Sequence, residues 1–344
     1  MNHIERFYAT IDRESVDRPA SWLGIPDNHA LPALYKHFGV TDMVGLKAAV
    51  GDDIYPVEMP YHSQTSNAIY AAFDFAKKKG GSVDERTLTA PGFFEDYHNP
   101  IDVEKFPWPV PSKHIDPEEC LRAVSEVPEG YAILGVIWSA HFQDACSAFG
   151  MEEALMRMMT EPEMFRAVID RIANFYLEAN EIFYNATKGK LHAVLIGNDL
   201  GSQCGLMVDP DSIREFVLPG TRKLVEQAKR HGLRVIHHSC GSIYDVIPDL
   251  IECGVDVIHP IQALASKMEP QRLHDDFGTE VSFCGGVDAQ YLLVNGSSDE
   301  VTAKVKELRE IFPTGLIISP SHEAILSDIP PVNIEALFKE AARI

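Results

Sequence analysis

The feature of this sequence that most constrains its fold is a repeated alternation between short apolar runs and longer amphipathic segments. The apolar runs are rich in β-branched residues, as expected of strands buried on both faces. The segments between them space their apolar residues as helices do. Because neighbouring parallel strands need a long crossover connection, the alternation predicts an α/β fold with a parallel sheet.

The apolar runs predict eight strands, over residues 20–25, 53–59, 131–138, 192–199, 233–239, 255–261, 281–287 and 315–321. The amphipathic segments predict helices over residues 151–184, 211–231, 243–253, 298–312 and 333–343. Eight βα units close most naturally into a TIM (βα)8 barrel. An open doubly wound sheet is the alternative, but no predicted strand leads into a glycine-rich dinucleotide motif or a phosphate-binding loop. Nucleotide binding is therefore not expected.

The helix over residues 211–231 carries clear start signals. Asp209 is its predicted N-cap and Pro210 its first residue, where the missing N–H of proline costs nothing. Pro219 should then kink or interrupt this helix.

Residues 60–110 break the alternation. The stretch GGSVDERTLTAPGFFEDYHNP (80–100) is rich in turn residues and predicts hairpin strands and loops inserted after the second strand. No linker, low-complexity tract or internal repeat divides the sequence. Residues 1–344 are therefore expected to form a single TIM-barrel domain that carries this insertion.

The charge balance narrows the range of partners and locations. The sequence has 30 Lys and Arg against 51 Asp and Glu, a formal net charge of −21, which disfavours nucleic acid and anionic membranes as partners. No apolar run approaches the length of a membrane span, and the opening NHIERFYATIDRE lacks the apolar core of a signal peptide. The six cysteines show no disulfide-scaffold spacing, so a cytoplasmic protein is expected.

Polar side chains collect where the predicted strands end. A TIM barrel brings the carboxyl ends of its strands around one cavity, where active sites lie. The residues concerned are Asp27, Asn28, His29, Asn198, Asp199, Gln203, Cys204, His238, Cys240, His259, Gln262, Asp288, Gln290, His322 and Glu323. The sequence therefore predicts one polar site at this end of the barrel.

The stretch VIHHSCG (235–241) suggests a metal at that site. His238 and Cys240 are two residues apart and face the same side of a strand, where an imidazole and a thiolate suit zinc. A catalytic zinc has about three protein ligands and one open position, so the third ligand must come from another strand. His322 is the first candidate and Cys204 the second, while Cys284 lies inside its predicted strand. The structural alternative is a half-buried strand end that runs into a tight turn.

Three further residues are candidates for catalysis. Asp199 either takes part in the chemistry or turns the loop that follows its strand. Gln262 and Glu323 are candidates for orienting the substrate or a ligand. His237 should point away from His238, toward the helices, and have a structural role.

Together these motifs resemble the uroporphyrinogen decarboxylase superfamily, and within it the cobalamin-dependent methyltransferases. The resemblance covers nearly the whole chain and includes an H-x-C-G motif. The stretches that carry it are ERFYATIDRESVDRPASW (5–22), YAILGVIWSAHFQDACSAFGMEEALMRMMTEPEMF (131–165), GNDLGSQCGLMVDPDSIREFVLP (197–219), HHSCGSIYDVIPDLIECGVDVIHPIQ (237–262) and ISPSHEAILSDIPPVNIEAL (318–337).

The resemblance implies a TIM barrel and a particular chemistry. In the methyltransferase branch the histidine and cysteine of H-x-C-G bind zinc, and these match His238 and Cys240. The branch takes its third ligand from a cysteine just after the last strand, where this chain has His322, so His322 is either a zinc ligand or a substrate contact. The implied function is a zinc-dependent methyltransferase that moves a methyl group between cobalamin, carried by a partner corrinoid protein, and a small molecule. Members of the family often form homodimers.

Two other functions stay open. The decarboxylase branch holds its porphyrin with an arginine-rich loop after the first strand, but this chain reads GIPDNHA (24–30), whose Asp27 would repel a substrate bearing many carboxylates. A metal-independent decarboxylase of a less charged substrate is the enzyme alternative, with Asp199 stabilising a protonated intermediate and His322 donating the proton. A corrinoid or small-molecule binding barrel without catalysis is the non-enzyme alternative.

Overall fold

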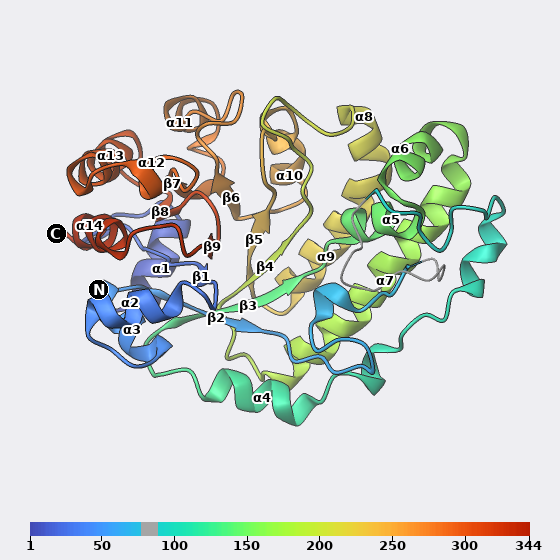
Figure 1. The fold of residues 1–344 in the computed structure, drawn as a ribbon, viewed down its shortest axis with the longest axis horizontal. Coiled ribbons are helices and arrows are strands. Elements are labelled where there is room, and N and C mark those ends of the chain that lie inside the picture. Colours follow the sequence, from blue (N-terminus) through green and yellow to red (C-terminus); the bar gives the residue numbers. More distant parts are fainter. Residues whose placement is uncertain (77–88) are drawn as a thin grey trace.

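A curled parallel sheet forms the centre of the computed structural model, which describes residues 1–76 and 89–344 (Figure 1). Within those residues seven strands follow one another in chain order around the sheet. They are β2 (Ile54–Glu58), β3 (Ala132–Trp138), β4 (Ala193–Gly197), β5 (Arg234–His238), β6 (Val257–Ile261), β7 (Ser282–Val287) and β8 (Leu316–Pro320). Seven of the predicted strands are thus confirmed, and the architecture fits a TIM-like barrel.

The predicted first strand, residues 20–25, differs from the expectation. Its start lies between the two edges of the sheet, because Ile318 N donates to Ala20 O (2.9 Å) and Asp53 N donates to Ser21 O (3.1 Å). Regular pairing appears only further on, between β1 (Ile25–Pro26) and β9 (Ala324–Ile325).

Gly24 explains the interruption. Its φ of +85° belongs to the left-handed region, and a Cβ there would lie 2.2 Å from the carbonyl oxygen of Glu323. The segment therefore turns at Gly24 instead of continuing as one strand.

Helices surround the sheet, with α5, α7 and α9 on one side of Figure 1 and α11 to α14 on the other. In the described part of the chain no helix has the length and apolar composition needed to cross a bilayer. The helices are α1 (His3–Ile11), α2 (Leu31–Phe38), α3 (Met43–Val50), α4 (Pro117–Ser125), α5 (His141–Phe149), α6 (Met151–Thr160), α7 (Pro162–Ala186), α8 (Pro210–Ser212), α9 (Leu218–Arg230), α10 (Ile247–Glu252), α11 (Pro270–Phe277), α12 (Leu292–Asn295), α13 (Ser298–Ile311) and α14 (Pro331–Ala341).

The start signals of the predicted helix 211–231 are confirmed. The side chain of Asp209 accepts a hydrogen bond from Ser212 N (3.0 Å), and Pro210 is the first residue of α8. A π-helical turn over Ile213–Val217 separates α8 from α9, in which Pro219 occupies the second position. The expected interruption is present, because proline offers no N–H to the preceding turn.

The inserted region after β2 is built from short 3₁₀ turns in its described part. These turns cover Ile69–Ala71 and Pro100–Lys105, and one isolated antiparallel bridge joins Ala76 to Gly92. The hairpin predicted within 80–100 falls partly on residues 77–88, which lie outside the described residues. The remainder, residues 89–100, contains no strand beyond that bridge, so the inserted hairpin is not confirmed.

Apolar side chains fill two regions on either side of the sheet. One cluster lies inside the curl of the sheet, and the other separates the sheet from the helices. The inner cluster consists of Phe7, Ile11, Ala20, Trp22, Ile54, Ala132, Leu134, Val136, Ala193, Leu195, Ile236, Val257, Cys284 and Ile317. This packing fills the interior and leaves the polar strand ends at its rim.

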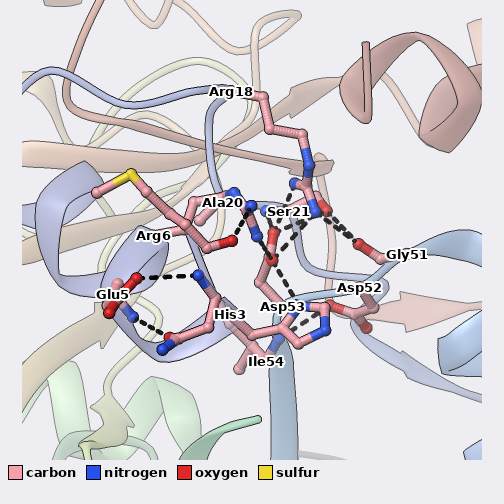
Figure 2. A network of polar contacts seen from close by, with 12 residues as sticks. His3, Glu5, Arg6, Arg18, Ala20, Ser21, Gly51, Asp52, Asp53 and Ile54 are labelled. Carbon is pink, nitrogen blue, oxygen red and sulfur yellow. Dashed lines mark hydrogen bonds and ion pairs between the residues drawn. The ribbon is translucent and has the colours of Figure 1, made fainter. Parts of the chain in front are cut away.

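A buried carboxylate fastens the N-terminal segment to the start of β2 (Figure 2). The side chain of Asp53 is fully buried and accepts hydrogen bonds from Arg6 Nη1 (2.7 Å), Arg18 Nη1 (2.7 Å) and Ser21 N (2.9 Å). His3 Nδ1 lies 2.8 Å from the same carboxylate. Burial acts to raise the pKa of Asp53, but these hydrogen bonds and the positive charge of Arg18 outweigh it and lower the pKa. The network lies where residues 20–22 join the two sheet edges.

Candidate active site

The strand ends bring three potential ligands together at the carboxyl end of the sheet. His238 ends β5, Cys240 follows it, and Asp199 lies two residues after β4. His238 Nε2 lies 3.5 Å from Cys240 Sγ and 3.3 Å from Asp199 Oδ1. All three potential ligand atoms lie within 4.8 Å of one another, so the side chains can reach a common ion.

Gly241 lets two loops come close enough to form this group. Its φ is +78°, and a Cβ there would lie 2.6 Å from the carbonyl carbon of Gly201. The turn after β5 therefore packs against the loop after β4, and Cys240 N donates to Asp199 Oδ1 (2.8 Å). The glycine that follows HSC in the sequence thus permits the close approach that places Asp199 beside Cys240.

The charges and hydrogen bonds within this group shift the pKa values of all three side chains. Burial acts to raise the pKa of Asp199, but the hydrogen bond and charge of His238 outweigh it and lower the pKa to about 2. Burial acts to lower the pKa of His238, yet Asp199, Cys240 and Glu323 together raise it well above its usual range. Burial likewise acts to raise the pKa of the Cys240 thiol, but His238 and His322 bring it below its usual value. His238 therefore favours the carboxylate form of Asp199 and makes the Cys240 thiol easier to ionise.

The Nδ1 side of the His238 ring lies beside a second pair of residues, His259 and Glu323. His238 Nδ1 lies 3.0 Å from His259 Nδ1 and 3.5 Å from Glu323 Oε2. Burial, with the nearby charges of His238 and His322, lowers the pKa of His259 well below its usual range. Oε2 of Glu323 is buried and has no hydrogen-bond partner within the described residues. His238, His259 and Glu323 form a second group whose potential ligand atoms lie within 4.8 Å of one another.

His322, the sequence's first candidate for the third ligand, lies beside the group of Asp199, His238 and Cys240. The ring centroids of His238 and His322 are 6.4 Å apart, and His322 Nδ1 accepts a hydrogen bond from Ala324 N (3.0 Å). A hydrogen bond to Cys240 raises the pKa of His322, against the effect of burial. Coordination of a metal by His322 stays a prediction. Asp199, in contrast, has a ligand atom within 4.8 Å of those of His238 and Cys240.

Gln262 supports the turn that carries Cys240. Its Oε1 accepts a hydrogen bond from Gly241 N (2.8 Å) and lies 3.5 Å from Gln203 Nε2. It also lines a cavity of about 250 Å³, together with Gln290, His322, Asp328 and several apolar residues. This cavity adjoins the group through His322 and is large enough for a small molecule.

The remaining cysteines and His237 do not join either group among the described residues. Cys204 is exposed on the loop after β4. Cys284 is buried within β7, as expected, and burial raises the pKa of its thiol. His237 is fully buried, and burial with the charge of His238 lowers its pKa to about 3, which agrees with the predicted structural role.

Asp288 and Asp27 also have local structural tasks. Asp288 accepts hydrogen bonds from the backbone N–H groups of Gln290, Tyr291 and Leu292, and so shapes the turn after β7. Asp27 accepts one from His29 N (2.8 Å) at an exposed position.

Trp138 is a site residue that the sequence analysis missed. Its ring meets the ring of His238 edge to face, with centroids 5.5 Å apart. Trp138 and Ser139 have φ values of +53° and +57°, in the left-handed region that residues other than glycine seldom adopt. Such strain at the end of a strand is typical of functional sites. The position of the tryptophan as the last residue of a predicted strand was the available signal.

A larger cavity lies away from these groups. It measures about 810 Å³, and aromatic residues of the inserted region, such as Tyr61, Phe93 and Trp108, line it. None of the predicted site residues borders it.

Comparisons with known proteins agree with this architecture. A methyltransferase from Methanosarcina mazei has a similar solved structure, with a TM-score of 0.70, 18% identity, and coverage of 99% of this chain and 98% of that one. A protein described as a vitamin-B12-independent methionine synthase, from Listeria monocytogenes, shows a weaker likeness, with a TM-score of 0.47 and 11% identity over 95% of this chain and 97% of that one. No curated protein matches the chain.

The family comparison is more decisive, because it covers most of the sequence. The family described as uroporphyrinogen decarboxylase (URO-D) matches residues 69–344, which include every member of the two groups around His238. The chain therefore belongs to the uroporphyrinogen decarboxylase family.

Proposed function

We propose that this chain is a zinc-dependent methyltransferase that moves a methyl group between a corrinoid cofactor, carried by a partner protein, and a small molecule. The observation that carries the proposal is the convergence of His238 Nε2, Cys240 Sγ and Asp199 Oδ1. Nitrogen, sulfur and oxygen donors in one place suit zinc, and three protein ligands leave one position open for a substrate. The fold shared with a methyltransferase supports this assignment.

The surroundings of the three donors fit a bound cation. Glu323 Oε2 is buried without a hydrogen-bond partner in the described part of the chain, 3.5 Å from His238 Nδ1. A buried carboxylate in that position balances a positive charge on the far side of the imidazole. When bound, zinc would supply Lewis-acid chemistry, either lowering the pKa of an acceptor thiol or polarising the leaving heteroatom of a methyl donor.

The protein groups around the donors have separate tasks. Asp199 accepts a hydrogen bond from Cys240 N, and Gln262 accepts one from Gly241 N. Both side chains therefore fix the turn that carries the Cys240 thiolate. His322 contacts Cys240 and lines the 250 Å³ cavity, which makes it a substrate contact in this proposal. Trp138 limits the movement of the His238 ring from the side.

The rim of the site carries exposed apolar side chains that suit a transient protein partner. Leu264 follows β6, Tyr291 follows β7 and Leu326 follows β9, and all three are exposed. Large exposed apolar residues gathered at a functional site often mark an interaction surface. We assign this rim to the corrinoid protein that would deliver the cofactor.

Elemental analysis of the purified chain tests the proposal. We expect about one zinc per chain in the wild type and little in Cys240→Ser, since a catalytic site with three protein ligands loses its sulfur donor. Cys204→Ser, which removes an exposed cysteine from the neighbouring loop, is the matched control and should retain the metal. The zinc-loaded wild type should also transfer methyl groups between free methylcobalamin and a panel of small thiols.

Decarboxylation is the competing function, because the matching family is named after a decarboxylase. In that case Asp199 would stabilise a protonated intermediate and His322 would donate the proton. Two results together would refute the methyltransferase proposal. The wild type would contain no zinc even when zinc is supplied, and the wild type and Cys240→Ser would decarboxylate a substrate at the same rate. Zinc binding without turnover of any donor or acceptor would instead indicate a binding barrel.

A further inference from the structure

His238 has two ring nitrogens, and each faces a different group. Nε2 faces Asp199 and Cys240, the side where the proposed cation binds. Nδ1 faces His259, with the two Nδ1 atoms 3.0 Å apart. His238 and His259 are paired in the register of β5 and β6, so both side chains belong to the interior of the sheet at the same level.

The distance between the two rings indicates a hydrogen bond. A separation of 3.0 Å lies within the usual range for nitrogen donors. Two nitrogens bound to one tetrahedral zinc at about 2.0–2.1 Å would be about 3.3 Å apart. The short separation therefore favours a proton between the rings over a shared metal.

The tautomers follow from this hydrogen bond. A neutral imidazole carries one proton, so a His238 whose Nε2 lone pair binds a cation must carry its proton on Nδ1. His259 Nδ1 must then accept that proton's hydrogen bond, which leaves the proton of His259 on its own Nε2. His259 is fully buried, and among residues 1–76 and 89–344 its Nδ1 is paired with His238 while its Nε2 has no hydrogen-bond partner.

We infer that His259 is a positioning residue, which accepts a hydrogen bond from Nδ1 of His238 and thereby holds Nε2 toward the cation. The inference rests on the proposed zinc site. Partners of this kind fix the orientation and tautomer of metal-binding histidines, and their loss typically lowers metal affinity about 10–100-fold. Glu323 Oε2, at 3.5 Å from the same Nδ1, contributes charge at a distance longer than an ordinary hydrogen bond.

Zinc affinity of matched variants, measured by competition with a chelator, tests the inference. His259→Leu removes the acceptor at similar volume, and His259→Asn places an amide oxygen near the position of Nδ1. Glu323→Gln removes the competing carboxylate. We expect about a 10–100-fold loss of zinc affinity in His259→Leu, a much smaller loss in His259→Asn, and a smaller loss in Glu323→Gln than in His259→Leu.

Several outcomes would overturn the inference. These are unchanged zinc affinity in His259→Leu, a larger loss in Glu323→Gln, or two zinc ions per wild-type chain, which would place a second ion between His238, His259 and Glu323. A purely structural role for His259 would lower the thermal midpoints of both His259 variants and leave their zinc affinity unchanged.

A measurement on the wild type keeps the inference testable if His259→Leu does not fold. Nitrogen NMR of the zinc-loaded chain with ¹⁵N-labelled histidine should show His238 protonated at Nδ1 and His259 protonated at Nε2. A proton on Nδ1 of His259 would overturn the inference. A wild type that binds no zinc would refute the proposed function itself, and this separates the two failures.

Discussion

Neutralising Asp53 should destabilise the fold by an amount that can be worked out from its contacts. Its carboxylate is fully buried and bonded to Arg6, Arg18 and Ser21 (Figure 2). The change Asp53→Asn keeps the shape but leaves two nearly buried guanidinium groups without this counter-charge. Breaking a buried ion pair costs about 3–5 kcal/mol, and since Arg6 keeps its pair with Asp17, we expect a loss of about 3 kcal/mol.

Equilibrium urea unfolding, followed by tryptophan fluorescence, measures this loss as a shift of the midpoint. Trp22 lies inside the sheet and reports on the loosening of residues 20–22. Asp211→Asn is the control, because Asp211 pairs with Arg214 at the surface and its side chain is 92% exposed. The control should leave the midpoint unchanged, since exposed pairs contribute little.

The loss should also depend on pH in a defined direction. The folded protein lowers the pKa of Asp53 below its ordinary value of 3.8, so its stabilisation is fully present above that value. It is lost as the pH falls through the folded pKa, because the protonated acid then resembles asparagine. The difference in unfolding free energy between wild type and Asp53→Asn should be constant from about pH 7 to 5 and shrink below about pH 4. A variant as stable as the wild type at pH 7, or a difference that persists unchanged in strong acid, would refute the reasoning.

Three further predictions concern the site and the turn beside it. Asp199→Asn should lower zinc affinity at least about tenfold, because it removes a charged donor, and unchanged affinity in a chelator titration would exclude Asp199 as a ligand. Cys284→Ser should leave the zinc content unchanged, since this thiol is buried within β7, and a zinc-free variant would contradict that. Gly24→Ala should destabilise by about 2 kcal/mol or more, because its Cβ would strike the carbonyl oxygen of Glu323, whereas Gly39→Ala, at φ +67° in open space, should cost about 1 kcal/mol. Equal thermal midpoints for the two glycine variants would show that the contact is not restrictive.

The sheet could be predicted from the sequence because its signals are local. Runs such as Ala132–Trp138 and Ala193–Gly197 are apolar on both faces, and only a strand covered on both sides buries such a run. The same local periodicity predicted that His238 and Cys240 face one side, and in the structure they lie 3.5 Å apart. The break at Gly24 was missed, because its cause is the carbonyl of Glu323, almost three hundred residues further along the chain.

The sequence by itself therefore determined the parallel sheet, the location of the polar end and the pair formed by His238 and Cys240. Only the tertiary structure decided that Asp199 joins this pair and that His259 and Glu323 lie on the other side of His238. The physical reason is that side-chain direction along one strand repeats every two residues, whereas distances between strands depend on register and on how closely loops pack. A close approach such as that of Gly241 to Gly201 has no signature in the local pattern, because it exists only once the whole sheet has curled.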